Sequence, residues 1–575
     1  MSFIAGITSL SGAPLSESMR SMFRGGLPES SEASFVHSHP RALLVQVDLG
    51  AHFERGHFED ASGVGVLAGH PLLPSDSTTG TPRGYRGAAA LLQASPAERR
   101  GLAAASNGNW AGAFYRADLG ELTLLGDRLS SRPLYWWCDD EVAVFASTLA
   151  FLEALPAVTT DVDPLGLLEK VSLGYSLSDR TPYRGVHRLL SGEVVVLGGR
   201  RVERSRYWDW SDLPESKDLD ALPQATLEAI RGAVARRQAG RRRALTLLSG
   251  GLDSRVINFL LHEIGADIHS FNFSPPGSQD AELGRQFAAA IGTTHHGAPR
   301  THWSILDLMV EASREVRSTA DNSAEFGPIW LGAGGSTCSG WALPTPSIMQ
   351  AMRSGDTLSA VRQHLQADAA QLIPTDLVSD ARRWLAGKLE SAMVEEIEKY
   401  SATMDKGRKF FLFLVENNQR RSLDTPLEGI LSHRQEVTTP FFDGSFLTQA
   451  LAVPVDAGLG HGFYDRWFRL LPPVVRSVPW QTYPGHLPCP LPIPEALPNQ
   501  WSARPPVREA RLQVLGKWAG LLAGQGFPSP VFRRSTLLIR AGLHVAGIRD
   551  ESTSINMASA FTRYWRQARH PTTPW

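Results

Sequence analysis

The sequence predicts an α/β protein that contains two kinds of β-sheet. Residues 1–205 carry short β-branched and aromatic runs between turn residues, which indicates stacked antiparallel sheets. After residue 243, short apolar runs alternate with helical segments, as in a doubly wound parallel sheet. A glycine-rich turn follows the first of these runs, where such sheets bind ligands.

The elements of the first part follow from local runs and turn signals. The expected strands lie at Ala42–Val47, Ala111–Tyr115, Leu122–Leu125, Leu134–Trp137, Val142–Phe145 and Gly192–Leu197. Asn107-Gly108-Asn109 is a turn signal before the second of them, and a helix is expected over Asp163–Gly174.

The second part begins near residue 206, where a polar segment leads into apolar residues at helical spacing. The expected order is helix Leu222–Arg237, strand Ala244–Leu248, helix Arg255–Ile264, strand Ile268–Phe273 and helix Ala281–Ile291. Residues 355–435 and the tail 507–575 also have helical patterns. The Pro-rich stretch Leu471–Pro506 is interpreted as an ordered wrapping loop that Trp480, Tyr483 and Trp501 anchor.

Composition narrows the class of protein. The 575 residues are 42% hydrophobic and 20% charged, enough apolar material for large buried cores in two or three domains. A net charge of −1 argues against coating of nucleic acid or an anionic membrane. The three cysteines Cys138, Cys338 and Cys489 form no disulfide framework, and no leader or long apolar segment is visible. These features predict a cytoplasmic protein without membrane or nucleic-acid partners.

The hexapeptide Ser249–Ser254 (SGGLDS) is the motif that carries chemistry. Adjacent glycines let the backbone approach an anion, and the start of the following helix adds its positive dipole end. Ser249 and Ser254 add hydroxyl donors, and Asp253 is a suitable ligand for Mg²⁺. Because a Walker lysine is missing, the turn suits the holding of pyrophosphate while chemistry occurs at the α-phosphate. The plain alternative is a glycine turn that only connects strand and helix.

This hexapeptide resembles the pyrophosphate loop of the asparagine synthetase family. Four further segments resemble the same family: Asp127–Tyr135 (DRLSSRPLY), Gly277–Asp280, Ile291–His296 and Glu436–Asp443 (EVTTPFFD). The resemblance implies an N-terminal Ntn-hydrolase-like α/β/β/α domain at residues 1–205 and an adenylating domain at 206–575. It also implies ATP and Mg²⁺ as cofactors, and formation of an amide through an acyl-adenylate.

The resemblance supplies the expected site residues. Nucleotide contacts are expected from Leu248, Ser249, Gly250, Gly251, Asp253, Ser254 and Phe273, with Asp253 as the metal ligand. Glu436 is the expected general base for the attacking amine. Arg469, or its neighbour Arg466, is expected to supply a cation to the adenylate, unless both are surface charges.

The sequence departs from the family at several positions. Ser2 stands where the glutaminase domain needs a cysteine, and the family's glutamine-binding motifs are missing, so this domain is expected to be inactive. Ser336, in Gly332–Ser336, replaces the second metal aspartate. Ala333 stands where β-lactam-forming relatives carry a tyrosine.

Loss of the glutaminase chemistry favours an amine already present in the substrate. The expected activity is therefore closure of a lactam or macrolactam, for example of a lasso peptide, with a small-molecule or peptide carboxylate as substrate. A leader-peptide protease or a precursor-binding protein would then be a partner. Two alternatives stay open: an amidotransferase that uses ammonia on an asparagine precursor or a sugar acid, the latter suggested by Val478–Gln481, and an inactive scaffold.

Overall fold

The computed structural model describes most of the chain and divides it into two compact units. Described are residues 2–27, 35–52, 55–61, 63–73, 87–274, 276–297, 305–319, 326–368, 374–482, 486–495, 497–498, 516–522 and 526–568. The first unit comprises Met1–Leu155, Leu189–Leu343 and Ser422–Ala503, and the second comprises Pro156–Arg188, Pro344–Arg421 and Arg504–Trp575. The predicted boundary at residues 205/206 is a different division and stays a prediction.

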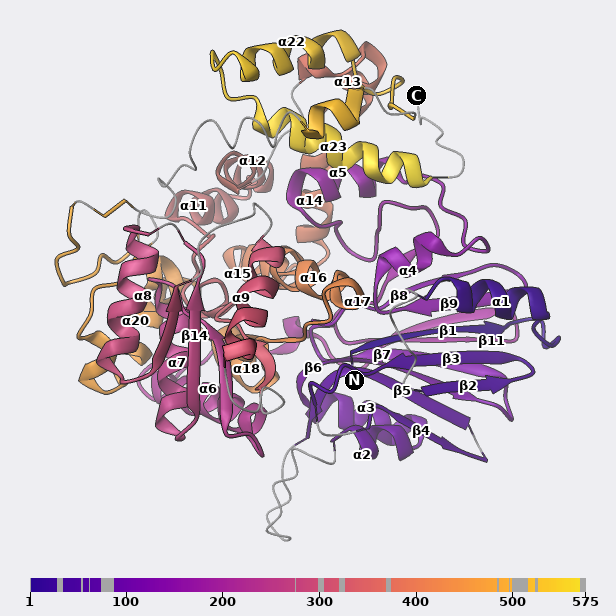
Figure 1. The fold of residues 1–575 in the computed structure, drawn as a ribbon, viewed down its shortest axis with the longest axis horizontal. Helices are drawn as coiled ribbons and strands as arrows, with labels where there is room; N and C mark the ends of the chain where they lie inside the picture. The colour runs from indigo at the N-terminus through magenta and orange to yellow at the C-terminus, as the bar shows by residue number, and fades with distance from the viewer. Residues whose placement is uncertain are drawn as a thin grey trace. The chain divides into compact units, whose positions relative to one another are not determined.

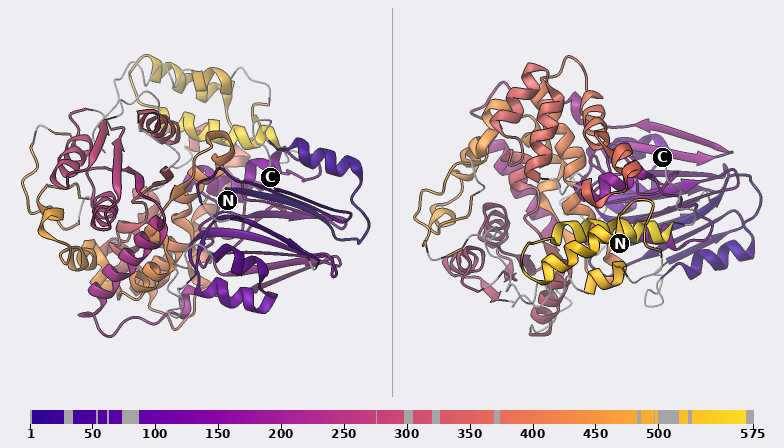
Figure 2. Two further views of the ribbon diagram at one scale, coloured as in Figure 1. Left: turned by 60° about the horizontal axis from the view of Figure 1, so that its bottom comes forward. Right: turned by 90° about the horizontal axis from the view of Figure 1, so that it is seen from above.

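Two antiparallel sheets form the N-terminal layers of the first unit (Figure 1). One sheet has the order β8-β9-β1-β3-β2, with strands Tyr135–Cys138, Val142–Ala146, Phe3–Ser9, Ala42–Val47 and Phe35–His39. The other has the order β12-β11-β7-β6-β5-β4, with strands Arg201–Arg206, Glu193–Gly198, Glu121–Gly126, Asn107–Arg116, Gly63–Leu72 and His57–Asp60. The sheets stack face to face (Figure 2), because alternate side chains of both enter one core that includes Ile4, Val66 and Phe145.

Helices cover the outer faces of these two sheets. Helix α2 (Gly87–Gln93) packs on β5, and α3 (Pro96–Ala105) follows it behind a capping box of Ser95 and Glu98. On the other sheet, α1 (Glu17–Gly25) and α4 (Leu149–Ala154) meet through the rings of Phe23 and Phe151, and Phe151 also contacts Phe3 of β1. The arrangement is the expected α/β/β/α sandwich.

A parallel sheet forms the rest of the core of the first unit. Its order is β15-β14-β13-β16-β17, with strands Thr294–Gly297, Asp267–Asn272, Arg243–Leu247, Phe326–Trp330 and Val437–Thr438. From β13, the next two strands in the chain, β14 and β15, lie on one side of β13. The following strand, β16, lies on the other side. The gap between the carboxyl ends of β13 and β16 is therefore a topological switch point, where open α/β sheets bind their ligands.

Helices lie on both faces of the parallel sheet, as a doubly wound sheet requires. Leu245 and Ile329 pack with Met309 of α9 (Ile305–Thr319), whereas the hydroxyl of Thr246 donates to Asn258 of α7 (Leu252–Glu263). Adjacent residues of a strand face opposite sides, so these contacts place α9 and α7 on opposite faces. The other helices of this unit are α6 Leu222–Gln238, α8 Gln279–Ala290, α10 Gly335–Ser339, α17 Ile430–His433, α18 Gly444–Leu451, α19 Val455–Gly458 and α20 Gly462–Phe468.

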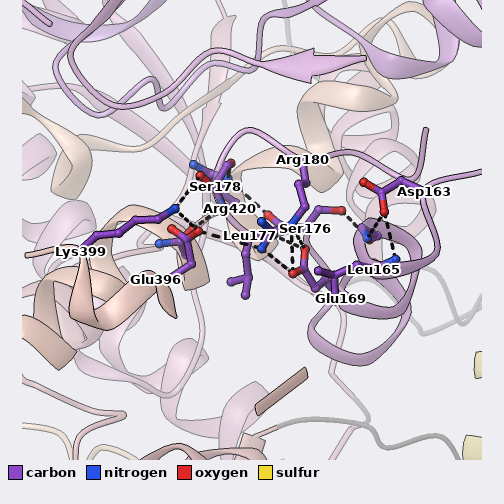
Figure 3. Close-up of polar contacts among 12 residues, drawn as sticks. Asp163, Leu165, Glu169, Ser176, Leu177, Ser178, Arg180, Glu396, Lys399 and Arg420 are labelled. Atoms are coloured by element: carbon purple, nitrogen blue, oxygen red, sulfur yellow. Dashed lines mark hydrogen bonds and ion pairs between the residues drawn. The ribbon is translucent and has the colours of Figure 1, made fainter. Parts of the chain in front are cut away.

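The second unit is helical. It contains α5 Pro164–Leu173, α11 Pro346–Ser354, α12 Thr357–Asp368, α13 Ser379–Leu385, α14 Lys388–Glu398, α15 Lys406–Phe413, a π-helical turn Leu414–Asn418, α22 Arg534–Val545 and α23 Ser552–Gln567, while α16 Arg420–Glu428 begins in this unit and ends in the first. A polar cluster lies beside α5 (Figure 3): Glu169 has no exposed side-chain surface and accepts hydrogen bonds from Arg180 Nη2 at 2.6 Å and Leu177 N at 2.9 Å. Burial raises the pKa of Glu169 to about 6 even though Arg180 opposes that shift.

None of the described helices is long and apolar enough to cross a membrane.

Candidate active site

The loop Ser249–Ser254 lies at the switch point of the parallel sheet, between β13 and α7. Helix α7 starts after Gly251, and no side chain caps its first turn. The first N–H groups of a helix have no intrahelical partner, so this end of α7 favours an anion. The strand, turn and helix stand in the order that the hexapeptide predicted.

Side-chain oxygens satisfy the N–H groups of the loop itself. Ser249 N donates to Ser254 Oγ at 3.0 Å, and Gly251 N donates to Ser249 Oγ at 3.2 Å. Gly250 N donates to Asp280 Oδ1 at 2.9 Å, and burial raises the pKa of that carboxyl. A phosphate oxygen that entered the loop would therefore compete with two hydroxyl groups, which can rotate away, and with one buried carboxylate.

The segment Gly332–Ser336 packs directly against the start of α7. A Cβ atom on Gly332 would lie 2.6 Å from Ser254 N, and one on Gly335 would lie 2.6 Å from Asp253 Cγ. Only glycine leaves room for backbone approach this close. The glycines that resembled the family's G-x-G-x-D segment thus have a structural reason in this chain.

Ser336 and Asp253 contact each other across this junction. Ser336 N donates to Asp253 Oδ2 and Ser336 Oγ donates to Asp253 Oδ1, both at 2.8 Å. Burial raises the pKa of Asp253 to about 6, against the effect of these bonds and of a further bond from Tyr464. Ser336, which replaces the expected second metal aspartate, therefore forms hydrogen bonds to Asp253, the expected metal ligand.

A cavity of about 280 Å³ opens beside these residues. It is lined by Leu247, Ser249, Gly251, Leu252, Asp253, Ser254, Leu331, Gly332, Ala333, Ser336, His461, Tyr464, Asp465, Trp480, Gln481, Thr482, Leu487 and Pro488. Asp253 and Asp465 are its two carboxylates, and no lysine or arginine is among these described lining residues. Burial lowers the pKa of His461 to about 3, so this imidazole is neutral and adds no positive charge.

The donor set fits Mg²⁺ only as part of a metal–nucleotide complex. In the described part of the chain, no group of three His, Cys, Asp or Glu side chains could hold a metal ion. Mg²⁺ commonly binds through one or two carboxylates together with waters and substrate phosphates. Asp253 with the Ser336 hydroxyl could supply the protein side of such a complex, in which the ion would neutralise phosphate charge.

The other predicted nucleotide contacts divide into two groups. Ser249, Gly251, Asp253 and Ser254 line the cavity, whereas Leu248, Gly250 and Phe273 are not among its lining residues. Leu248 is fully buried and its carbonyl accepts a bond from Asn272 Nδ2, while Phe273 packs against the apolar core beneath β13. Gly250 contributes by its carbonyl, which accepts a bond from Gln481 N at 3.0 Å.

Glu436, the predicted base, is absent from the cavity lining and forms a buried ion pair. Arg132 donates to it twice, from Nη2 to Oε1 at 2.8 Å and from Nη1 to Oε2 at 3.1 Å. Arg132 Nη2 also donates to the carbonyl of Ser2. Glu436 directly precedes β17, whose residue Val437 pairs with Ile329, the second-to-last residue of β16. Glu436 thus does not line the cavity that Asp253 lines, and its catalytic role stays a prediction.

Arg469, the predicted cation, lies on the surface of the first unit. Its side chain is 58% exposed and donates from Nε to Asp465 Oδ2 at 2.6 Å. Arg466 instead pairs with Asp220 at 3.1 Å. Arg469 itself is not a lining residue, so its connection to the cavity runs through Asp465.

Sequence reasoning missed the residues that form the far wall of the cavity. Trp480, Gln481 and Thr482 of the Pro-rich stretch line it, and Tyr483 and Trp501, two of the three expected anchors, lie outside the described residues. Arg255 holds this wall in place from α7. The Pro-rich composition and the aromatic residues signalled an ordered loop, but no local signal said which surface it would cover.

Comparisons with known proteins agree with this arrangement. Residues 90–208 match the family model of a glutamine amidotransferase domain, and residues 225–331 match the model of asparagine synthase. Among curated proteins, the chain is similar to asparagine synthetase [glutamine-hydrolyzing] 3 of Bacillus subtilis, with 24% identity over 36% of this chain and 36% of the relative. A putative asparagine synthetase [glutamine-hydrolyzing] 2 of Methanocaldococcus jannaschii is 23% identical over 30% of this chain and 35% of the relative. The matches thus span about a third of each relative's length.

Solved structures give weak overall matches. A glutamine phosphoribosylpyrophosphate amidotransferase from B. subtilis, in complex with ADP and GMP, covers 59% of this chain and 77% of its own, with 11% identity and a TM-score of 0.24. A structure described as the allosteric regulatory enzyme of purine biosynthesis covers 57% of this chain and 74% of its own, with 12% identity and the same TM-score of 0.24.

The chain therefore joins a glutamine amidotransferase-type sandwich to an asparagine synthase-type parallel sheet. Over these two segments the chain resembles the asparagine synthetase family.

Proposed function

We propose that this protein is an ATP-dependent ligase that forms an amide bond within one substrate molecule. A substrate carboxylate would attack the α-phosphorus of ATP and displace pyrophosphate. The amine would then attack the acyl carbon, form the C–N bond and release AMP, while the nitrogen gives up a proton to a base. The main observation behind this proposal is the cavity at the switch point. It is lined by residues of the loop Ser249–Ser254 and by the start of α7, which no side chain caps.

The residues of the cavity have separate roles in this proposal. The start of α7 and the hydroxyls of Ser249 and Ser254 would hold the phosphate chain. Asp253 would face the metal that accompanies ATP and neutralises its charge. Asp465 lines the cavity whereas Glu436 does not, so Asp465 is the carboxylate better placed to receive the proton of the amine.

The state of Ser2 supports an amine that comes from the substrate. Ser2 is fully buried, its Oγ accepts a hydrogen bond from Leu49 N at 3.2 Å, and its carbonyl is held by Arg132. A serine hydroxyl is a far weaker nucleophile than a thiolate. Closure of a lactam or macrolactam, as in a lasso peptide, needs no ammonia from glutamine and is therefore the activity that we favour.

A direct test is exchange of labelled pyrophosphate into ATP, with synthetic peptides that carry a free N-terminal amine and one internal Asp or Glu side chain. We expect exchange with at least one peptide and a product that has lost one water. Asp253→Ala should abolish exchange, and Asp118→Ala, at an exposed ion pair, should leave it unchanged. Exchange with free aspartate and ammonium instead would identify an ammonia-dependent amidotransferase, and Ser2-dependent glutamate release from glutamine would contradict the substrate-amine proposal.

A second candidate is an inactive nucleotide-binding scaffold, which the contact between Ser336 and Asp253 favours. A scaffold would bind ATP in calorimetric titration but catalyse no exchange with any carboxylate. The lack of both binding and exchange would overturn the ligase and this alternative together.

A further inference from the structure

One wall of the cavity is a strap, defined here as residues Val475–Thr482. Arg255 of α7, only 1% exposed, donates three hydrogen bonds to strap carbonyls: to Val475 at 3.2 Å, Val478 at 2.6 Å and Pro479 at 2.7 Å. Gln481 N donates to the carbonyl of Gly250 at 3.0 Å. The strap is thus tied both to the helix that follows the loop and to the loop itself.

The side chain of Gln481 is buried and unpartnered in this wall. Gln481 is 8% exposed, and neither its amide nitrogen nor its amide oxygen has a hydrogen-bond partner within the described residues. A buried amide without partners destabilises a fold, so such a group needs a reason. Gln481 lines the cavity, but its amide atoms have almost no exposed surface, so a rotation of the side chain toward the cavity would bring the amide to a ligand there.

The surroundings indicate what this ligand group is. The described lining residues include no lysine or arginine, and the N–H groups of Ser249, Gly250 and Gly251 already bond to side-chain oxygens. A phosphate chain in this cavity therefore has no cationic partner among the described lining residues. A glutamine amide offers two N–H donors, and its backbone bond to Gly250 keeps it beside the loop.

We propose that Gln481 is a phosphate-binding residue whose amide donates to the phosphate chain of the bound nucleotide, in place of a basic side chain. This inference rests on the proposed function, since it takes ATP as the ligand. The strap holds the backbone of Gln481 in place before binding, so that the amide gains its partners when the nucleotide enters. Gln481 thus selects nucleotides that carry phosphates over the bare nucleoside.

The test compares wild type with Gln481→Leu and Gln481→Glu in titrations with ATP, ADP, AMP and adenosine, followed by calorimetry. Loss of one donor to a charged phosphate should weaken ATP and ADP binding about tenfold to a hundredfold in the Leu variant. The Glu variant should weaken them at least as much, because a carboxylate repels phosphate. Adenosine affinity should stay within about twofold of wild type. Gln224→Leu, on the exposed face of α6, is the matched control and should behave as wild type.

A second readout needs no ligand. Replacement of a buried unpartnered amide by an apolar group of similar shape should raise the melting temperature of the free protein, by about 1–3 °C. A partner that Gln481 already has in the free protein would instead make Gln481→Leu melt lower.

Three outcomes would overturn the proposal, and they differ from one another. ATP affinity equal in wild type and Gln481→Leu would remove the phosphate role alone. Equal losses for ATP and adenosine would move the contact to the nucleoside. A wild-type protein that binds no ATP at all would overturn the proposed function, and this inference with it.

Discussion

Asp253 lines the cavity, and burial raises the pKa of its carboxyl group to about 6. The carboxyl group can bind a cation only when it is ionised, so metal binding at Asp253 depends on pH. Between pH 7 and pH 5 the ionised fraction falls about tenfold for a pKa near 6.

We therefore expect Mg·ATP to bind about tenfold more weakly at pH 5 than at pH 7 through this group alone. Calorimetric titration at pH 5, 6 and 7 measures the change. Protonation of ATP itself affects wild type and Asp253→Asn equally. The variant should therefore lack only the part of the pH dependence that comes from Asp253. Parallel profiles for wild type and the Asn variant would show that Asp253 does not bind the metal.

Ser336 offers a gain-of-function experiment at the same junction. In Ser336→Asp a second carboxylate would stand beside Asp253, where the serine hydroxyl now lies at 2.8 Å. Two adjacent carboxylates repel each other without a cation and form a better Mg²⁺ site with one. We expect a lower melting temperature in EDTA, recovery with millimolar Mg²⁺, and tighter Mg·ATP binding. A variant whose melting temperature ignores Mg²⁺ would speak against a metal at this position.

At the scale of elements, the Arg132–Glu436 pair ties the turn before β8 to the segment before β17. The side chains are 4% and 0% exposed, respectively. Removal of one partner leaves a buried charge uncompensated, which commonly costs about 3–5 kcal/mol. The pair therefore has a structural role that does not depend on catalysis.

Glu436→Gln and Arg132→Met should each lower the free energy of unfolding by about 3–5 kcal/mol, and the double variant Arg132→Met/Glu436→Leu should recover much of this loss. Urea unfolding measures both effects. A catalytic base would give another result: Glu436→Gln would fold as stably as wild type and lose turnover.

The elements near the loop were predictable because their signals are local. The sequence predicted a strand over Ala244–Leu248, a glycine turn and a helix from Arg255, and the structure has β13 Arg243–Leu247 and α7 Leu252–Glu263. The helix begins earlier than expected because Gly251 can serve as its N-cap without a side chain. The position of Glu436 was not predictable from its motif, because it depends on the register between β17 and β16.

Long-range partners explain the rest of what the sequence did not reveal. The sequence predicted only that Arg255 belongs to a helix. In the structure its side chain donates to carbonyl groups that lie more than 200 positions later in the sequence. Gln481 had no distinguishing neighbour in the sequence, and only its burial beside the cavity marks it. Composition predicted an ordered loop, but only the fold places its described residues Trp480, Gln481 and Thr482 against the cavity.

At the scale of the whole molecule, the second unit has its own response to pH. The pKa of Glu169 is raised to about 6 from an ordinary value of 4.5, so the folded unit binds a proton more tightly than the unfolded chain does. The contribution of this group to stability is complete below about pH 4.5 and is lost as pH rises through about 6.

We expect the helices around Glu169 to lose about 1–2 kcal/mol of protection between pH 4.5 and pH 6.5. Hydrogen exchange of peptides from α5 and α14, corrected for the intrinsic rate, measures this loss. Glu169→Gln should remove the dependence in α5, while peptides from β13 serve as the internal reference. A pH-independent α5 in wild type would contradict the raised pKa.

The hydrogen bonds from Arg255 to the strap also set an order of events during synthesis on the ribosome. Arg255 and Pro479 are 224 residues apart, so the turn and its helix leave the ribosome about 10–45 s before the wall that completes them, at ordinary elongation rates. During that interval a buried arginine has no carbonyl partners and the turn lies open to water. A nascent chain stalled before Pro479 would therefore have the glycine turn without the completed cavity, and nucleotide capture should begin only once the strap has emerged.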